Sequence, residues 1–458
     1  MQHSLPETAA PPKPPLHVPF YYGWVVLAVC FISTFFAGAT SQLFTSIMVV
    51  PITEELGWTR TEMAGALTVG VAFTAVLGAV FGPLADRFGP RPLVTSGAFV
   101  VAAGFFGLAG MHDLWHFYLA YTVGRAVAQA ATSGVVVSTT VTNWFVQRRG
   151  RAMGFMGMAF QFSNTLLIPA AQFIGQRSSW RAVYGLLGAG TAFFVIAPAA
   201  LFLRRRPEDL GLLPDGDHSA AAAPLRHAEP HPRLSVAQPP SAVRGAEDGP
   251  SRATDVSFTV REALCTRAFW LLVFAESLVA FVSGSLTFNL VSHFADVGIS
   301  PAASAGALSF FALTSGFSST IWGFLSERFS ERLMAIVSTL LGGVGVFFLI
   351  GVRTDVLAVL LCGYYGVAAR GEHSMLTLIL ARYFGRGSFG AIRGAMGPIS
   401  YVSLGLGPLV GSMAFDFYGT YAGFLGFLIL CHLLTAGLLA LARQPKLPSI
   451  REQRRRTP

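Results

Sequence analysis

The sequence predicts an all-α membrane protein with twelve transmembrane helices in two pseudo-symmetric six-helix bundles. Hydrophobic residues make up 53% of the 458 residues and charged residues only 12%, about half the share of an average soluble domain. The hydrophobic residues are also gathered in runs of about twenty, which is the length that a helix needs to cross a hydrocarbon core of about 30 Å.

Six such runs precede a polar stretch and six follow it. The first six are Tyr22–Phe44, Met63–Ala85, Leu93–Met111, Leu114–Val141, Ala152–Ile174 and Val183–Leu203. The second six are Phe269–His293, Ala303–Leu325, Leu333–Val352, Val356–Tyr383, Phe389–Ala414 and Tyr421–Leu441. They are numbered helices 1 to 12 below.

The polar stretches divide the chain into five parts. Residues 1–19 are rich in proline, and residues 207–262 are rich in alanine, proline, serine and charge without periodicity. Such compositions favour disorder. We therefore expect a disordered arm (1–19), an N-terminal bundle (20–206), a disordered linker (207–262), a C-terminal bundle (263–443) and a basic tail (444–458).

Lysine and arginine are concentrated in alternate connections, as the positive-inside rule requires of cytoplasmic loops. The connections on the other side hold only four, which are Arg60, Arg177, Arg181 and Arg353. We therefore expect a multi-pass protein of the cell (inner) membrane with both termini, the arm, the linker and the tail in the cytoplasm. This bias accounts for most of the net charge of +9, so no nucleic-acid partner is expected.

The two halves resemble each other. The connection after helix 2, FGPLADRFGPRPLV, is echoed after helix 8 by WGFLSERFSERLMA, and NWFVQRRGRAMG before helix 5 is echoed by RYFGRGSFGAIRG before helix 11. Two like halves with a substrate site at their interface are a common design of membrane transporters.

The stretch from Gly82 to Arg91, GPLADRFGPR, resembles the Gly-x-Leu-x-Asp-Arg-x-Gly-x-Arg signature of the major facilitator superfamily between helices 2 and 3. Its weaker copy, from Gly323 to Arg328, lacks the later glycine. Arg125 lies in helix 4, where many members of that family carry a buried arginine. The resemblance covers essentially all of the membrane part and implies the major facilitator fold.

Three further stretches resemble the bacterial monocarboxylate transporter-like branch of that family, namely YYGWVV, PITEELGWTRTEMAGA and NWFVQRRGRAMGFMG. The branch moves small organic anions with protons, or exchanges them. Well-studied members of the branch carry an acid and an arginine in helix 8, and that arginine holds the substrate carboxylate. Helix 8 of this chain has no charge, and helix 1 lacks the lysine that some members use. Membership is therefore better supported than a monocarboxylate substrate.

The loop after helix 2 is a candidate gate. Carboxylate and guanidinium groups at a helix end can pair and cap neighbouring helices, which is worth about 1–2 kcal/mol when partly buried and less when exposed. The resemblance implies that this loop helps to hold the outward-open state through Gly82, Asp86, Arg87, Gly89 and Arg91. The alternative is a basic loop that only sets the topology.

Five ionisable residues lie deep in the predicted helices, where charge is costly and normally marks a transport path. They are Arg125 (helix 4), Glu276 (helix 7) and Arg370, Glu372 and His373 (helix 10). In the major facilitator fold, helices 1, 4, 7 and 10 line the central cavity. His293 and Arg393 are expected near the membrane interfaces, where long side chains reach water.

Arginine grips a carboxylate or phosphate through two parallel hydrogen bonds. Arg125 and Arg370 are therefore the candidates for binding an anionic substrate, together with His373 on the same face as Arg370. Gln161 and Asn164 in helix 5 could add neutral hydrogen bonds. The alternatives are an ion pair of Arg125 with Glu276 across the halves, a packing role for His373, and contacts between helices for Gln161 and Asn164.

A carboxyl group held away from water binds a proton more readily than one in water. Glu276 and Glu372 are therefore the candidates for proton coupling, and His373 titrates near neutral pH in water. The alternative for either glutamate is a permanent salt bridge.

Helical geometry separates the charges of helix 10. At about 100° per residue, Arg370 and His373 share a face, whereas Glu372 lies about 200° from Arg370. Arg370 shares its face with Gly366, Ser374 and Thr377. We therefore expect one of Arg370 and Glu372, preferably Arg370, to face the cavity and the other to contact an adjacent helix.

These observations favour a secondary active transporter that moves a small organic anion with a proton by alternating access and acts as a monomer. One alternative is a proton-driven exporter of hydrophobic or cationic compounds, in which the glutamates face the substrate. A second is a membrane sensor that binds ligand without transport. No nucleophile–base pair, cysteine–histidine metal spacing or phosphate loop indicates an enzyme, a metal or a cofactor.

Overall fold

A computed structural model describes residues 18–145, 148–213, 215, 258–385 and 389–445. Every regular element among them is helical. Most of the expected arm 1–19, linker 207–262 and tail 444–458 lies outside the described residues. At the described ends of the linker, Pro207–Leu210 form a 3₁₀ turn and Val260–Leu264 form the short helix α10, so these ends are ordered rather than disordered.

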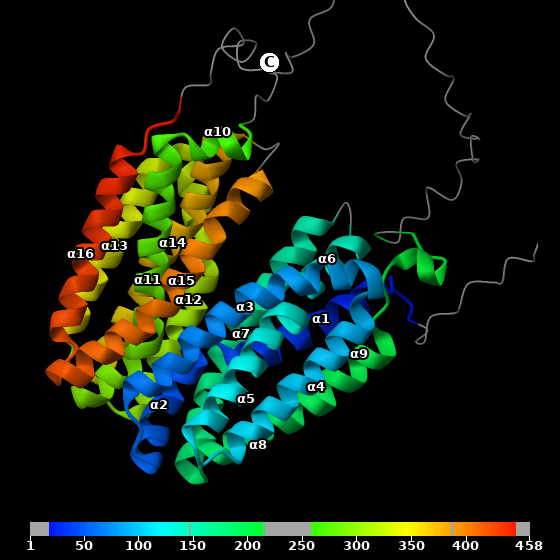
Figure 1. The fold of residues 1–458 in the computed structure, drawn as a ribbon, viewed down its shortest axis with the longest axis horizontal. Coiled ribbons are helices and arrows are strands. Elements are labelled where there is room, and N and C mark those ends of the chain that lie inside the picture. The colour runs from blue at the N-terminus through cyan, green and yellow to red at the C-terminus, as the bar shows by residue number, and fades with distance from the viewer. Residues whose placement is uncertain (1–17, 146–147, 214, 216–257, 386–388, 446–458) are drawn as a thin grey trace, which may run out of the picture.

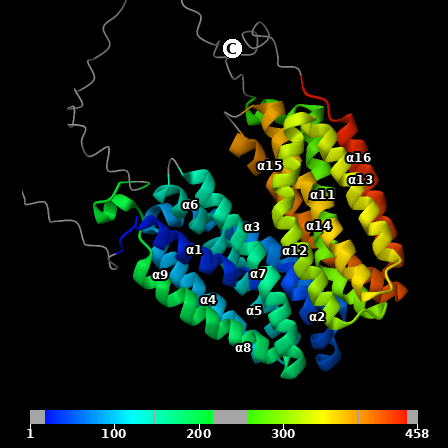
Figure 2. The ribbon, with the colours of Figure 1, turned by 180° about the vertical axis from the view of Figure 1, so that it is seen from behind.

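The helices fall into two bundles joined through the linker (Figures 1 and 2). The first bundle contains α1 (Gly23–Ala37), η1 (Gly38–Thr40), α2 (Gln42–Leu56), α3 (Arg60–Phe88), α4 (Pro90–Ala109), α5 (Leu114–Val127), η2 (Ala128–Ser133), α6 (Val135–Trp144), α7 (Arg149–Arg177), α8 (Trp180–Thr191), η3 (Ala192–Ile196) and α9 (Ala197–Phe202). The second contains α10, α11 (Arg267–Asp296), α12 (Pro301–Arg328), α13 (Glu331–Ile350), α14 (Asp355–Phe384), α15 (Phe389–Tyr418) and α16 (Ala422–Leu441).

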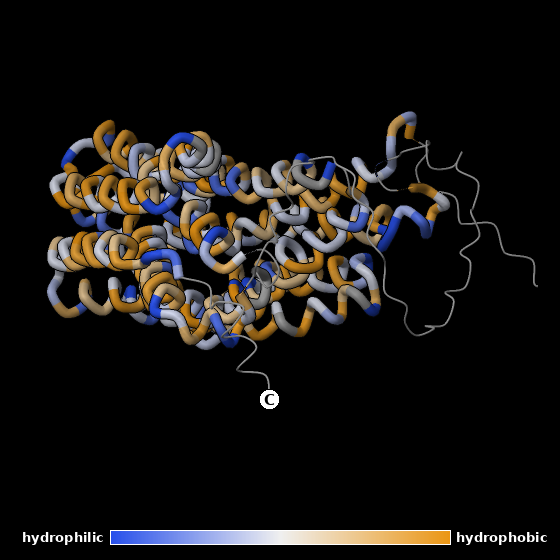
Figure 3. Tube along the Cα trace, turned by 90° about the horizontal axis from the view of Figure 1, so that it is seen from above, coloured by the Kyte–Doolittle hydropathy of each residue, from blue (hydrophilic) through white to orange (hydrophobic). Residues whose placement is uncertain are grey.

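Within the described residues, nine helical stretches are long and apolar enough to cross a membrane. Three other helical stretches complete the expected twelve but are not among these nine, namely 114–144, 149–177 and 355–384. The last of them carries Arg370 and Glu372. Figure 3 shows hydrophobic residues along most of the helical length, which identifies a multi-pass membrane protein.

Short polar motifs set where several helices begin. Thr59 and Glu62 form a capping box at the start of α3, and the hydroxyls of Thr266, Ser300 and Ser330 cap α11, α12 and α13. Each cap satisfies N–H groups that have no acceptor inside their helix. These caps define where the four helices begin.

Helix 1 differs from its predicted form. Helical structure extends past Phe44 to Leu56, but it is interrupted at Gly38–Ser41, where a 3₁₀ turn leads to an extended Ser41 (φ −67°, ψ 155°). The hydroxyl of Ser41 then caps α2 by accepting from the N–H of Phe44. In a membrane, such irregular backbone is tolerated where it lines a cavity or is buried in protein.

The two bundles meet at one end and lie apart at the other (Figure 1). The end at which they lie apart carries α6 and α10 and is called the termini end; the opposite one is called the far end. Where the bundles meet, α3 packs on α15, α7 on α12 and α2 on α11. Among the described residues, the hydrogen bonds between bundles lie at the far end or near the middle, such as that from Thr68 Oγ1 to the carbonyl of Gly405 at 2.7 Å.

Candidate functional site

Two adjoining cavities, of about 540 and 690 Å³, lie between the bundles. The first is lined mainly by the N-terminal bundle and the second mainly by the C-terminal bundle. Six residues line both cavities, which are Ala75, Ser283, Phe311, Arg370, Tyr401 and Leu404. The two cavities therefore form one continuous site at the bundle interface.

The first cavity carries many polar side chains and a positive charge. Its polar lining side chains are Ser41, Gln42, Thr74, Arg125, Gln129, Gln161, Asn164, Ser283, Thr287, Arg370 and Tyr401. Two of them are arginines, one from each bundle, and no aspartate or glutamate is found among the described residues that line this cavity. Its electrostatic character therefore suits an anion.

Arg125 is held at the interruption of helix 1. Arg125 is 8% exposed, and its Nη1 donates to the carbonyl oxygen of Thr40 at 2.5 Å and lies 3.4 Å from the hydroxyl of Tyr121. The alternative ion pair between Arg125 and Glu276 is wrong, because Glu276 has another partner within its own bundle. A guanidinium has five N–H donors, so Arg125 keeps donors for a ligand.

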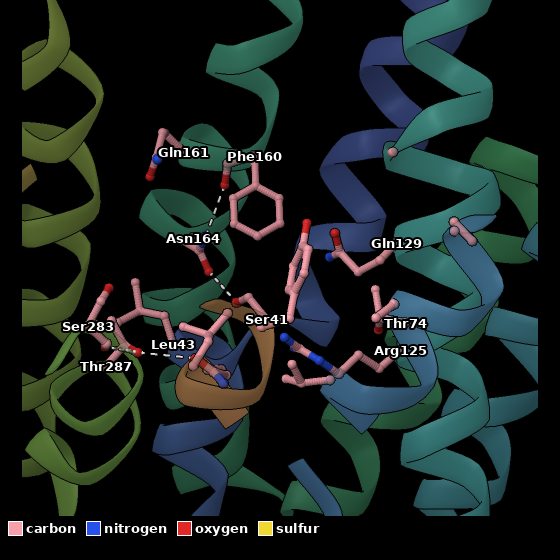
Figure 4. A pocket seen from close by; sticks show the side chains of 18 of the residues that line it. Ser41, Leu43, Thr74, Arg125, Gln129, Phe160, Gln161, Asn164, Ser283 and Thr287 are labelled. Carbon is pink, nitrogen blue, oxygen red and sulfur yellow. Dashed lines mark hydrogen bonds between the residues drawn. The ribbon is translucent and has the colours of Figure 1, made fainter. Parts of the chain in front are cut away.

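The helix that carries Arg125 changes form one turn later. Residues Ala128–Ser133 form a π-helical turn, and Gln129 within it lines the first cavity beside Arg125. Such wide turns often occur at functional sites because they redirect side chains. Figure 4 shows Gln129 and Arg125 both extending into the cavity from this helix.

Helix α7 supplies the amide side chains that the sequence singles out. Asn164 is buried, accepts from Ser41 Oγ at 2.7 Å and donates to the carbonyl of Phe160 at 3.0 Å. Gln161 is half-buried and packs against Gly316 of α12, in the other bundle. Both line the first cavity (Figure 4), and Asn164 also makes the contact between helices that the alternative interpretation foresees.

Arg370 borders both cavities from α14. Its guanidinium lies 5.5 Å from the ring centre of Phe311, and no hydrogen bond or ion pair joins it to another described residue. A cation over an aromatic face is partly stabilised, but its hydrogen-bond donors stay free. Arg370 is therefore the least compensated charge of the site.

Glu276 pairs with Arg393 of α15. The two Arg393 nitrogens approach the two carboxylate oxygens at 2.9 and 3.1 Å, and both residues line the second cavity. Arg393 lies near the start of α15 and has Glu276 as its partner; its expected place near a membrane interface stays a prediction. A buried Glu276 needs a cationic partner, and this need was a signal that the sequence reasoning missed. The sequence alone does not show where in the chain that partner lies.

The helical spacing predicts that Arg370 and Glu372 of α14 lie on different faces, with one of them in contact with an adjacent helix, and the structure agrees in part. Glu372 is 3% exposed and accepts from Thr339 Oγ1 of the adjacent α13 at 3.2 Å. His373 is exposed to the second cavity. The expectation that only one of Arg370 and Glu372 borders the cavity is wrong, since both line the second cavity.

The candidate gating loop lies at the termini end, away from the cavities. Gly82, Asp86 and Arg87 belong to the last turns of α3, while Gly89 (φ +77°) joins it directly to α4, where Arg91 is exposed. A positive φ at this joint favours glycine. The Arg87 guanidinium lies 5.3 Å from the ring centre of Phe88, and the side chain of Asp86 lies outside the described part.

A cluster at the far end was not foreseen. Arg60 at the start of α3 pairs with Asp296 at the end of α11 through two bonds of 2.6 and 2.8 Å. Its guanidinium also lies 3.8 Å from the ring centre of Phe415, and the backbone N–H of Thr61 donates to Asp416 at 3.2 Å. The two bundles are thus joined at this end by charged groups of both.

The family model of the Major Facilitator Superfamily matches residues 30–296 and 272–458. The chain belongs to this superfamily and is therefore a membrane transporter and not an enzyme. Its fold, with two helical bundles around a central site, is the fold that the sequence predicts.

Within the superfamily, the relatives confirm the resemblance to the monocarboxylate transporter-like branch. The chain is 29% identical over 210 residues to human (Homo sapiens) monocarboxylate transporter 11 and 29% identical over 205 residues to a probable L-galactonate transporter of Escherichia coli K12. These matches cover 44% and 43% of this chain and 43% and 45% of the relatives, so they span less than half of each. The oxalate:formate antiporter of Oxalobacter formigenes is 24% identical over 368 residues, which cover 80% of this chain and 73% of the antiporter.

Solved structures agree on the fold. A bacterial homologue of the human lysosomal transporter Spinster, in an inward-facing and occupied conformation, aligns with a TM-score of 0.67 at 15% identity. The alignment covers 93% of this chain and 97% of the homologue. At this identity the likeness concerns the fold alone.

Proposed function

We propose that the protein moves a small organic anion across the cell (inner) membrane by alternating access, coupled to a proton. The observation that carries the proposal is the pair of arginines, Arg125 and Arg370, which face one cavity from opposite bundles. A substrate anion that contacts both would bind best when both bundles surround it. Such a ligand links binding to the relative movement of the bundles.

Support for the anion comes from the charge balance of the site. The first cavity is lined by two arginines and by no described aspartate or glutamate. In the second cavity the carboxylate of Glu276 is already paired with Arg393, and Arg370 makes no ion pair with a described carboxylate. The names of the relatives, which include monocarboxylate, galactonate and oxalate transporters, point to the same class of substrate.

Alternating access is proposed from the asymmetry of the two ends. The charged cluster around Arg60 closes the far end, whereas the bundles lie apart at the termini end (Figure 1). With the termini in the cytoplasm, this is an inward-open conformation. The loop of Asp86, Arg87 and Arg91 at the termini end would then stabilise the opposite, outward-open conformation.

Proton coupling is assigned to Glu372, with His373 beside it and Glu276 across the second cavity. Glu372 is buried at the edge of this cavity and has no ion pair among the described residues. A carboxyl group in surroundings of low dielectric can load and release a proton. Protonation there and anion binding at Arg370, two residues away, would influence each other through their charges.

Proton-driven export of hydrophobic or cationic compounds receives less support, because Glu276 already has a cationic partner in Arg393. A sensor without transport has no specific observation in its favour.

The test is uptake of radiolabelled lactate, oxalate, formate and galactonate into proteoliposomes, with and without a pH gradient. We expect uptake of at least one anion that increases when the outside is acidic. Uptake of no small anion, together with binding of lipophilic cations, would overturn the proposal. In Arg125→Ala the anion affinity should fall about tenfold or more, since a hydrogen bond to a charged group contributes about 1.5–3 kcal/mol; a normal affinity would remove the role of Arg125.

A further inference from the structure

The interruption of helix 1 leaves the N-terminus of α2 at the first cavity. Ser41, Gln42 and Leu43 all line this cavity. The first bonds of α2 run from the N–H of Thr45 to the carbonyl of Ser41 at 3.0 Å and from the N–H of Phe44 to the Ser41 hydroxyl at 3.0 Å. The N–H groups of Gln42 and Leu43 precede these bonds and have no acceptor inside the helix.

Two buried donors lie at the same place and also lack partners. Arg125 and Gln42 are 8% and 7% exposed and line the first cavity. Neither Arg125 Nε nor Gln42 Nε2 has a hydrogen-bond partner among the described residues. Leaving a buried donor unpaired is costly, so the arrangement calls for an acceptor that the described protein does not provide.

The arginine and the helix end are fixed relative to each other. The bond from Arg125 Nη1 to the Thr40 carbonyl, one residue before Ser41, brings the guanidinium to the interruption. Figure 4 shows the Arg125 side chain extending toward the segment that carries Ser41 and Leu43. The site is therefore assembled before any ligand arrives, which reduces the entropy lost on binding.

We infer that the interruption of helix 1 is the carboxylate subsite of the cavity, where a carboxylate is held between the Arg125 guanidinium and the N–H groups of Gln42 and Leu43. The inference rests on the proposed function and names the place of the substrate's charged group. A helix N-terminus carries about half a positive charge, and it adds to the full charge of Arg125. No described acidic side chain of this cavity competes for the two groups.

This placement leaves the rest of the substrate a defined path. Asn164 and Gln161 of α7 line the same cavity as the interruption (Figure 4). Arg370 of the other bundle also lines this cavity. A substrate with hydroxyl groups or a second carboxylate can therefore bind both bundles at once. A short monocarboxylate such as formate would occupy the subsite alone.

A pair of variants separates the backbone N–H from the side chain. Gln42→Pro removes both the side chain and the N–H of this residue, whereas Gln42→Ala removes only the side chain. Proline is tolerated at the first position of a helix, and the extended conformation of Ser41 is the one that a residue before proline prefers. Both variants lose the contact of Gln42 with Thr287 in the other bundle, so that loss cancels in the comparison.

The measurement is equilibrium binding of radiolabelled oxalate and galactonate to the purified full-length protein. We expect Gln42→Pro to bind the carboxylate about tenfold or more weakly than Gln42→Ala, as for the loss of one hydrogen bond to a charged group. Equal affinities of two folded variants would overturn the subsite while leaving the proposed function intact. If no carboxylate binds even to the wild type, the subsite and the proposed function both fail.

A second measurement needs no variant. Hydrogen–deuterium exchange of the wild type should slow at Gln42 and Leu43 when saturating oxalate or galactonate is bound, and it should not slow with the corresponding uncharged amide. Exchange that is unchanged at these two residues with a carboxylate bound would overturn the subsite. This readout decides the matter if Gln42→Pro fails to fold.

Discussion

The ion pair of Arg60 with Asp296 offers the sharpest test of how the bundles open. It joins α3 of one bundle to α11 of the other through two short bonds, with side-chain exposures of 16% and 30%. Exposed ion pairs contribute little, but a bidentate and partly buried pair contributes about 1–2 kcal/mol. Asp296→Asn should therefore change the ratio of far-end-closed to far-end-open molecules roughly 5- to 30-fold.

The assay is the distribution of distances between two spin labels at the far end, in a Cys265→Ser background because Cys265 is exposed. Glu54→Cys and Tyr418→Cys place the labels on exposed positions of opposite bundles. We expect Asp296→Asn to populate longer distances. The matched control is Glu55→Gln, which breaks the pair with Arg181 inside a single bundle at the same end.

Two results would refute the reasoning. Asp296→Asn could leave the distances as in the wild type, in which case the ion pair does not bias the equilibrium. Alternatively, Glu55→Gln could lengthen them equally, in which case the effect is one of general loosening. The distances should also shift less at high salt, because screening weakens exposed pairs.

Three further changes follow from the site. Glu372→Gln should abolish the dependence of uptake on a pH gradient, because an amide cannot load and release a proton, while exchange of labelled for unlabelled anion persists. Undiminished uptake driven by the pH gradient would contradict the role of Glu372. Glu276→Gln leaves Arg393 without its carboxylate and so adds one net positive charge to the second cavity, which is worth on the order of 1 kcal/mol. The anion should therefore bind about fivefold more tightly in an equilibrium binding measurement. Weaker binding of the anion would refute this prediction. Asp86→Asn should slow transport in a correctly inserted protein by weakening the loop that stabilises the outward-open state; initial rates equal to those of the wild type would remove the gating role.

The family and the fold could be predicted from the sequence because they depend on features that repeat along the chain. Runs of apolar residues mark the helices, and the signature from Gly82 to Arg91 has the same spacing as in the family. The spacing of Arg370, Glu372 and His373 also predicts a partner for Glu372 on an adjacent helix, and Thr339 lies there.

The details of the site could not be predicted because they depend on tertiary contacts. Hydropathy gives no sign that helix 1 is interrupted at Gly38–Ser41, since every residue there is small or neutral. The pair of Glu276 with Arg393 joins residues 117 positions apart. Arg125 takes a backbone carbonyl as its partner, and no side-chain pattern identifies such an acceptor.

The central claim is that Arg125 and Arg370 bind one anion between the bundles. Its most direct test is the binding of a radiolabelled carboxylate long enough to reach both arginines (oxalate or galactonate), and of the lipophilic cation tetraphenylphosphonium, to the purified wild type, Arg370→Ala and the control Arg353→Ala. We predict that the wild type and the control bind the carboxylate alike and that Arg370→Ala binds it at least about tenfold more weakly. Carboxylate binding that is unchanged in Arg370→Ala, or binding of the cation in place of any carboxylate by the wild type, would contradict the account.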